Sequence, residues 1–211
     1  MHRDSVAPVV PYRVRQVRER ERDILRVAAE LITQHGYHAT SMDDIAGALG
    51  IAKGTLYQHF ASKEALVVAL VQERFSSLLD SLRAARVRAC SPAGALLEAL
   101  RLLFEGQSQG LRIFDVTAGA MLALADCEPL HGLRLELNEL LVEIVRDGQA
   151  SGEVDPSIDP RIAASALYAL STPRPYRTLL ATGHADEASL VEELGRLYLG
   201  GIASPARAGR K

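Results

Sequence analysis

Residues 40–60, with the sequence TSMDDIAGALGIAKGTLYQHF, restrict the fold of this chain more than any other stretch. In its first half, apolar side chains recur at the i, i+3, i+4, i+7 spacing of an amphipathic helix: Met42, Ile45, Ala46 and Leu49. Gly50 then allows the backbone to leave this helix in a left-handed conformation. A second short helix follows, with Leu56 and Phe60 on one side. Two short helices joined by a tight turn predict a helix-turn-helix over residues 41–60, whose second helix would enter the major groove of DNA.

The residues just before the first of these helices suit a helix start. Thr40 and Ser41 each stand three positions ahead of an acidic residue, Asp43 and Asp44 respectively, which is the spacing of a capping box. We therefore expect both hydroxyls to cap this helix.

Helical patterns flank the motif on both sides. Apolar side chains recur with helical period from about Arg18, and Gly36 suits the end of that helix. Ser62 is a suitable N-cap for a long helix that continues to about Arg88. The first three helices are the minimum that buries a shared core around the turn, and Tyr37 is expected to pack beneath the motif.

Beyond Pro92 the pattern is helical throughout, which predicts an all-α chain of about nine helices. Further helices are expected around residues 96–104, 113–125, 130–150, 162–170 and 187–199. Pro173 and Pro175 follow the fourth of these, and proline removes a backbone donor and clashes with the preceding turn. That helix is therefore expected to break or kink near Thr172.

Three runs together resemble the TetR family of transcriptional regulators: T-S-M-D-D-I-A, G-I-A-K-G-T-L-Y-Q-H-F and S-K-E-A-L directly after it. The resemblance covers roughly residues 18–78. It implies a three-helix DNA-binding head over residues 18–78, joined by the long fourth helix to a helical body over residues 79–203 that binds an effector and dimerises. Residues 1–17 are expected to form a flexible basic arm, and residues 204–211 a disordered tail.

The resemblance also implies which residues contact DNA: Thr40, Ser41, Lys53, Gly54, Thr55, Tyr57, Gln58, His59 and Lys63. The hydroxyls at the start of the first motif helix and Lys63 would meet phosphate, while Thr55 and Gln58 suit base edges. The family commonly has Ser or Thr where this chain has Ala52, so the second motif helix lacks a side-chain cap.

For the body, the resemblance implies an effector pocket and a dimer interface. Candidate pocket residues are Phe104, Phe114, Met121, Leu122, His131, Arg134, Leu137 and Tyr168. The preponderance of aliphatic side chains favours an apolar or lipid-like effector. The interface would use residues 162–170 and 190–199, where Gly195, Gly200 and Gly201 allow close helix approach.

The favoured function is therefore a homodimeric repressor that an effector releases from a near-palindromic DNA operator. One alternative is a DNA-binding regulator without a small-molecule effector, constitutive or controlled by a protein partner. Another is an activator. The sequence shows no nucleophile elbow, phosphate-binding glycine loop or set of metal ligands, so we expect neither an enzyme nor a cofactor.

Composition limits the remaining possibilities. The net charge is −2, yet residues 1–22 hold six arginines against three acids, a local charge of +3 that suits phosphate contact. No apolar run approaches the ~20 residues of a membrane span, and the N-terminus lacks a signal-peptide core, so a cytoplasmic protein is expected. Cys90 and Cys127 form no disulfide framework, and the run from Asp126 to His131 lacks zinc-site spacing, so no metal is expected.

Overall fold

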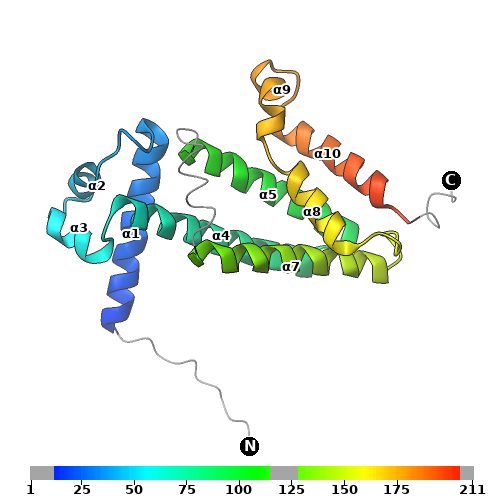
Figure 1. Cartoon of the computed structure of the whole chain (residues 1–211), viewed down its shortest axis with the longest axis horizontal. Coiled ribbons are helices and arrows are strands. Elements are labelled where there is room, and N and C mark those ends of the chain that lie inside the picture. The colour runs from blue at the N-terminus through cyan, green and yellow to red at the C-terminus, as the bar shows by residue number, and fades with distance from the viewer. Residues whose placement is uncertain (1–11, 115–127, 205–211) are drawn as a thin grey trace, which may run out of the picture. The chain divides into compact units, whose positions relative to one another are not determined.

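The structure, a computed structural model, describes residues 12–114 and 128–204, and of residues 13, 14, 109–114, 128 and 129 it describes only the backbone. The regular elements in these ranges are helices, which confirms the all-α prediction (Figure 1). None of these helices combines the length and the hydropathy of a membrane span. The chain forms two compact units, Met1–Leu70 and Val71–Lys211.

The first unit is built on three helices, α1 (Tyr12–His35), α2 (Met42–Leu49) and α3 (Lys53–His59). The apolar positions predicted from helical spacing form its core. Its fully or almost fully buried apolar side chains are Ile24, Leu25, Ala28, Ile32, Met42, Ile45, Ala46, Leu56 and Phe60, together with Leu66, Val67 and Leu70 from the start of α4 (Lys63–Arg88). Burial of these side chains is the main force that holds helices as short as α2 and α3 in place, because isolated helices of this length are marginal in water.

Helix α1 begins at Tyr12, so the prediction that residues 12–17 belong to a flexible arm is wrong. These residues lack a sustained apolar period, and the four with described side chains, Tyr12, Arg15, Gln16 and Val17, are exposed, but arginine and glutamine are good helix formers. The hydroxyl of Tyr12 also accepts a hydrogen bond from Gln16 Nε2 at 2.8 Å, one helical turn later. Residues 1–11 and 205–211, the rest of the predicted arm and most of the predicted tail, lie outside the described residues.

The long helix α4 (Lys63–Arg88) begins where the sequence placed it. Ser62 caps it, since its Oγ accepts a hydrogen bond from the N–H of Ala65 at 3.2 Å. The boundary between the two compact units falls inside this helix, after Leu70, rather than after residue 78 as predicted.

The second unit contains α5 (Pro92–Phe114), α7 (Glu128–Ala150), α8 (Pro160–Leu170) and α10 (Glu187–Ile202). Leucines, alanines and valines from these helices and from α4 form one core. The glycine at position 148 sets the spacing at the end of α7, because an added Cβ would lie 2.6 Å from Val154 Cγ2. A short antiparallel bridge between Val154 and Ala203 ties the end of α10 to the loop after α7.

The break predicted near Thr172 is present. Helix α8 ends at Leu170, and the chain continues through a 3₁₀ turn at Arg174–Tyr176 and the short helix α9 (Arg177–Ala181) before α10. The two prolines account for this interruption. The predicted helix at 113–125 lies almost wholly outside the described residues.

Candidate nucleic-acid interface

Ser41 forms the predicted capping box at the start of α2. Its Oγ accepts a hydrogen bond from the N–H of Asp44 at 3.1 Å, and its own N–H donates to Asp44 Oδ2 at 2.8 Å. The Ser41 hydroxyl also donates to Asp44 Oδ2 at 2.6 Å. The hydroxyl of Ser41, followed by its backbone N–H, lowers the pKa of the Asp44 carboxyl below its usual value. Ser41 is exposed, so it keeps the position expected of a phosphate-contacting residue.

Thr40 does not occupy the role predicted for it. Its side chain is buried, with 2 % of the residue surface exposed, and its hydroxyl donates to the carbonyl of Gly36 at 2.9 Å. The hydroxyl therefore closes the turn after α1 and neither caps α2 nor faces a phosphate. Two adjacent hydroxyl residues with the same spacing to an acid thus have different partners.

The turn between α2 and α3 has the predicted left-handed residue. Gly50 has φ 64° and ψ 31°, and its N–H and that of Ile51 reach back to α2 carbonyls. Ala52 precedes α3 without a side-chain cap hydrogen bond, as its methyl group requires. Backbone hydrogen bonds close the turn, and burial of Leu56 and Phe60 holds α3 to the core.

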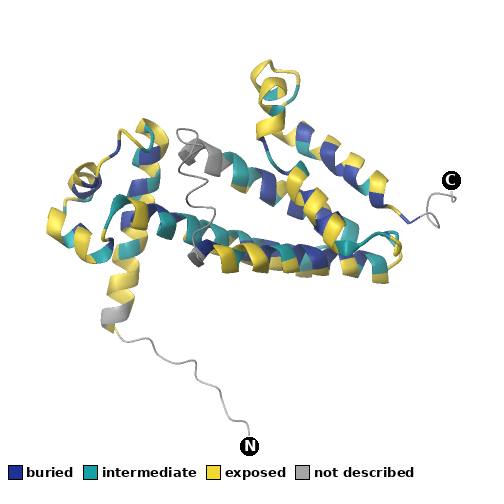
Figure 2. Cartoon of the chain, in the orientation of Figure 1, coloured by how far each residue is buried: buried dark blue, intermediate teal, exposed yellow. Residues whose placement is uncertain are grey.

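Four of the predicted contact residues on α3 form an outward surface, which we call the α3 face: Lys53, Gly54, Tyr57 and Gln58. All four are exposed, and Thr55 beside them is half-buried (Figure 2). Tyr57 keeps 42 % of its surface exposed, which is high for a large aromatic residue in a folded domain. At Gly54 no other group lies within 4 Å of where a Cβ would stand, so a ligand backbone could approach closely.

Lys53 is paired with a residue that the sequence did not single out as its partner. Its ammonium lies 2.7 Å from Asp43 Oδ1 and 2.9 Å from Oδ2, across the turn from α2. The same nitrogen lies 5.9 Å from the centre of the Tyr57 ring. The hydrogen bond to Asp43 raises the pKa of Lys53, so this side chain is a cation at neutral pH. The pairing depends on the fold of the turn, which brings together residues ten positions apart.

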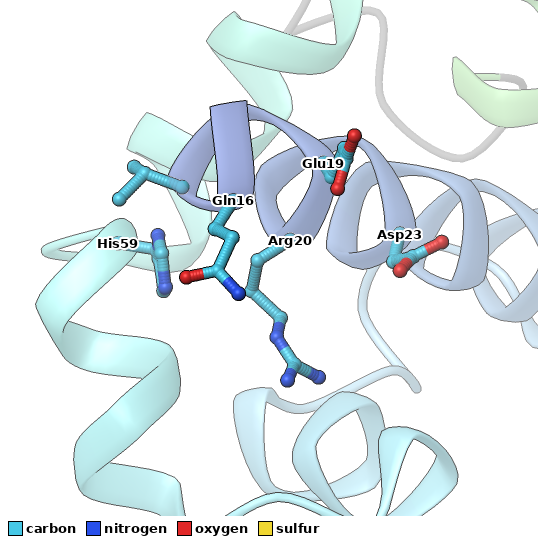
Figure 3. Close-up of a pocket in the computed structure, with 6 residues that line it drawn as sticks. Gln16, Glu19, Arg20, Asp23 and His59 are labelled. Carbon is cyan, nitrogen blue, oxygen red and sulfur yellow. The ribbon is translucent and has the colours of Figure 1, made fainter. Parts of the chain in front are cut away.

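His59 does not lie on the α3 face but is directed toward α1, and its contact with DNA stays a prediction. Its Nδ1 lies 3.5 Å from Glu21 Oε1 on α1, and its side chain is only 15 % exposed. With Gln16 and Arg20 of α1 it lines a shallow hollow of about 580 Å³ (Figure 3). The sequence did hold a signal for this position, since His59 follows the buried Leu56 by three residues and so shares its side of the helix.

Lys63 is also held away from solvent. Its ammonium donates a hydrogen bond to the carbonyl of Tyr37 and lies 4.0 Å above the Tyr37 ring. Partial burial lowers the pKa of Lys63, while the Tyr37 hydroxyl donates to Glu64 Oε1 at 3.2 Å. Tyr37 thus packs at the start of α4, where Lys63 contacts it, and the contact of Lys63 with phosphate stays a prediction.

The candidate effector residues of the body do not share one environment. Phe104 and Leu137 are core residues, exposed by 0 % and 4 %. His131, Arg134 and Tyr168 are exposed. Met121 and Leu122 lie outside the described residues, as does the side chain of Phe114. Among the described residues, no three His, Cys, Asp or Glu side chains gather as metal ligands would.

Comparison with known proteins agrees with this geometry. Residues 24–70, which include the whole helix-turn-helix, match the family described as bacterial regulatory proteins, tetR family. The HTH-type transcriptional regulator RutR of Escherichia coli K12 is 31 % identical over 150 residues, which cover 68 % of this chain and 70 % of RutR. The chain belongs to the TetR family. It is a DNA-binding transcriptional regulator with a helix-turn-helix head.

Other TetR-family proteins extend the similarity over most of the chain. The regulator UidR of E. coli K12 is 29 % identical over 183 residues, covering 85 % of this chain and 90 % of UidR. The solved structure of the fatty acid degradation regulator FadR from Bacillus halodurans superposes with a TM-score of 0.69 at 25 % identity, covering 86 % of this chain and 95 % of that chain. The similarity therefore includes the body as well as the head.

Proposed function

We propose that this TetR-family protein is a homodimeric repressor that binds a near-palindromic operator through α3 and is released by a small apolar or lipid-like effector. The observation that carries the proposal is the α3 face, where Lys53, Gly54, Tyr57 and Gln58 project outward while Leu56 and Phe60 hold the helix to the core. An amide such as Gln58 suits the donor and acceptor pattern of a base edge. The Ser41 hydroxyl and Tyr57 suit contacts to the sugar-phosphate backbone.

Exposed residues on α8 and α10 support the dimer. On α8, small or apolar exposed residues recur at i, i+3, i+4 and i+7: Ile162, Ser165, Ala166 and Ala169. On α10, Leu197 is 70 % exposed, and at Gly200 and Gly201 nothing lies within 4 Å of a Cβ position. Gly195, by contrast, packs within the chain, because its Cβ would fall 2.4 Å from Leu97 Cδ2. We call these exposed residues the dimer face: Ile162, Ser165, Ala166, Ala169, Leu197, Gly200 and Gly201. A second copy of this chain would bury them.

The proposed effector class is based on the core of the body and on a relative of the chain. The body core is aliphatic, and the B. halodurans relative is described as a fatty acid degradation regulator. An effector that binds one state of the body better than the other would loosen operator binding by about 5- to 150-fold at the usual coupling energies.

Selection of random DNA duplexes with the purified protein, followed by gel-shift titration at fixed salt, tests the DNA part of the proposal. We expect an inverted-repeat sequence to be enriched. Tyr57→Ala should then weaken binding to all duplexes, whereas Gln58→Ala should change the preferred bases at fixed positions. Gln34→Ala, at an exposed glutamine of α1, is the matched control and should change neither. Equal losses on operator and random DNA for Gln58→Ala would contradict its role in base readout.

Thermal-shift screening against acyl chains and other small metabolites tests the effector part. A compound that stabilises the protein and also releases the operator supports the repressor mechanism. A regulator that no compound stabilises, yet that binds its operator, favours the constitutive or protein-partnered alternative. A reporter gene behind the selected operator separates repression from activation.

A further inference from the structure

The two helices of the motif carry more negative than positive charge. Residues 42–49 contain Asp43 and Asp44, whereas residues 53–59 contain Lys53 and a single histidine. With histidine counted as neutral, the two helices carry two carboxylates and one ammonium. A DNA-binding surface gains its sequence-independent affinity from cations that replace counterions at phosphates. The motif itself is therefore poorly supplied with such cations.

This ammonium, that of Lys53, is moreover already paired with a carboxylate of the protein. Both carboxylate oxygens of Asp43 lie within hydrogen-bonding distance of Lys53 Nζ, at 2.7 and 2.9 Å. Asp44 has a different partner, the capping box of Ser41, so it does not compete for this cation. Both members of the pair are largely exposed, at 59 % and 62 % of their side-chain surfaces, so the pair lies in reach of an approaching duplex.

Two outcomes are open to Lys53 when DNA arrives. If the pair stays intact, Lys53 contributes little to phosphate binding. If Lys53 turns to a phosphate, the Asp43 carboxylate is left without its partner next to a polyanion, which is unfavourable. Either outcome reduces the affinity for DNA of any sequence. The uncharged groups of the α3 face, Tyr57 and Gln58, are not affected in this way.

We propose that Asp43 limits the sequence-independent affinity of the motif for DNA, which it does by holding Lys53 on the protein. It is a positioning residue, since it acts through Lys53 rather than through a base. This inference rests on the proposed operator binding. The operator would overcome the loss through groove contacts that other sequences lack.

The test is Asp43→Asn, which removes the charge and keeps the shape of the side chain. Dissociation constants are measured on the selected operator and on a random duplex across a salt series. We expect tighter binding to both duplexes and, on each of them, a salt slope steeper by about 0.9 for each subunit, as one new phosphate contact gives. Between 50 and 200 mM salt, this steeper slope means that the variant loses about threefold more affinity per subunit than the unsubstituted protein. An unchanged salt slope on both duplexes overturns the proposal.

Two further variants separate the pair from a general charge effect. In a Lys53→Gln background, Asp43→Asn should have little effect, because the cation it would free is absent. If Asp43→Asn has the same effect in that background, Asp43 acts by simple repulsion of phosphate. That result also overturns the proposal. Glu30→Gln removes a similarly exposed carboxylate of α1, paired with Arg26 in its own helix, and should leave the salt slope unchanged. Circular dichroism is the control that each variant is folded.

The outcome is distinguishable from failure of the proposed function. If the unsubstituted protein enriches no sequence, operator binding itself is wrong. If it enriches an operator and Asp43→Asn leaves the salt slope unchanged, only the role of Asp43 is wrong.

Discussion

Thr40 and Ser41 are neighbours with similar hydroxyl side chains, yet they make different contributions to the head. Ser41 caps α2 through Asp44, whereas the Thr40 hydroxyl is buried on the carbonyl of Gly36. The difference arises because the chain bends between α1 and α2, so that one hydroxyl points into the turn and the other along the new helix. At this scale, a residue's role depends on its backbone neighbours more than on its type.

Ser41→Ala should lower the free energy of unfolding by about 1 kcal/mol, the usual cost of losing an N-cap. It should also change the dependence on pH. Hydrogen bonds from Ser41 lower the pKa of Asp44 in the folded state below its unfolded value of 3.8. The stability that this provides is present above pH 3.8 and is lost as the pH falls through the lower folded pKa.

Urea unfolding followed by circular dichroism between pH 7 and pH 3 measures both effects. The acid-side loss of stability should be smaller in Ser41→Ala than in the unsubstituted protein. Thr33→Ala, at an exposed hydroxyl that bonds the Ala29 carbonyl within α1, is the control and should leave the shape of the pH profile unchanged. Parallel profiles for all three proteins would argue against the Ser41–Asp44 link.

Thr40→Val keeps the shape of a buried side chain and removes its hydroxyl. We expect a loss of about 0.5–1.5 kcal/mol in unfolding free energy, since the Gly36 carbonyl loses one hydrogen bond. Operator affinity, measured well below the melting temperature, should be unchanged, because this hydroxyl does not face solvent. A marked fall in operator affinity with normal stability would restore the phosphate-contact role that the sequence predicted.

The packing of a whole helix depends on a few positions where it closely approaches another segment. Helix α7 contains two glycines in different surroundings. Gly148 is buried against Val154, while Gly132 is exposed and has nothing within 4 Å of a Cβ position. The end of α7 and the following loop can approach one another only because residue 148 has no side chain.

Gly148→Ala should therefore destabilise the protein by about 1–3 kcal/mol, as overpacking of a well-filled core does. The added methyl would meet Val154, which is 1 % exposed and stiff because it is branched at Cβ. Gly132→Ala, in the same helix, should instead stabilise by up to about 1 kcal/mol through helix propensity. Chemical unfolding of both variants is the measurement, and stabilisation by both substitutions would contradict this packing.

For the whole molecule, the proposed dimer links DNA recognition to self-association. One recognition helix reads few bases, so two copies acting on one inverted repeat are needed for useful specificity. Substitutions on the dimer face should then act on operator binding without touching the α3 face.

Leu197→Arg should weaken dimerisation by about 2 kcal/mol or more, the cost expected at a central interface residue. Analytical ultracentrifugation should show monomer at concentrations where the unsubstituted protein is dimeric, and operator affinity should fall. Val87→Arg, at a side chain 85 % exposed on α4 and outside the dimer face, is the control. A fully dimeric Leu197→Arg protein would place the interface elsewhere.

Much of the fold followed from sequence because its signals are local. Helix periods, the capping box of Ser41, the left-handed Gly50 and the break before Pro173 all depend on residues within about four positions of one another. The start of α1 was misplaced since its first turns are helical without an apolar stripe to reveal them.

The partners of the site residues required the tertiary structure. Lys53 meets Asp43 across the turn of the motif, while His59 meets Glu21 of α1 and Lys63 meets the carbonyl of Tyr37, both distant in sequence. Spacing along the chain carries no information about such pairs, because they arise only when helices pack at particular angles. The sequence by itself therefore determined which helices form and that the chain carries a DNA-reading motif. Only packing decided which side chains of that motif stay free to reach DNA, since burial and long-range pairing occupy the others.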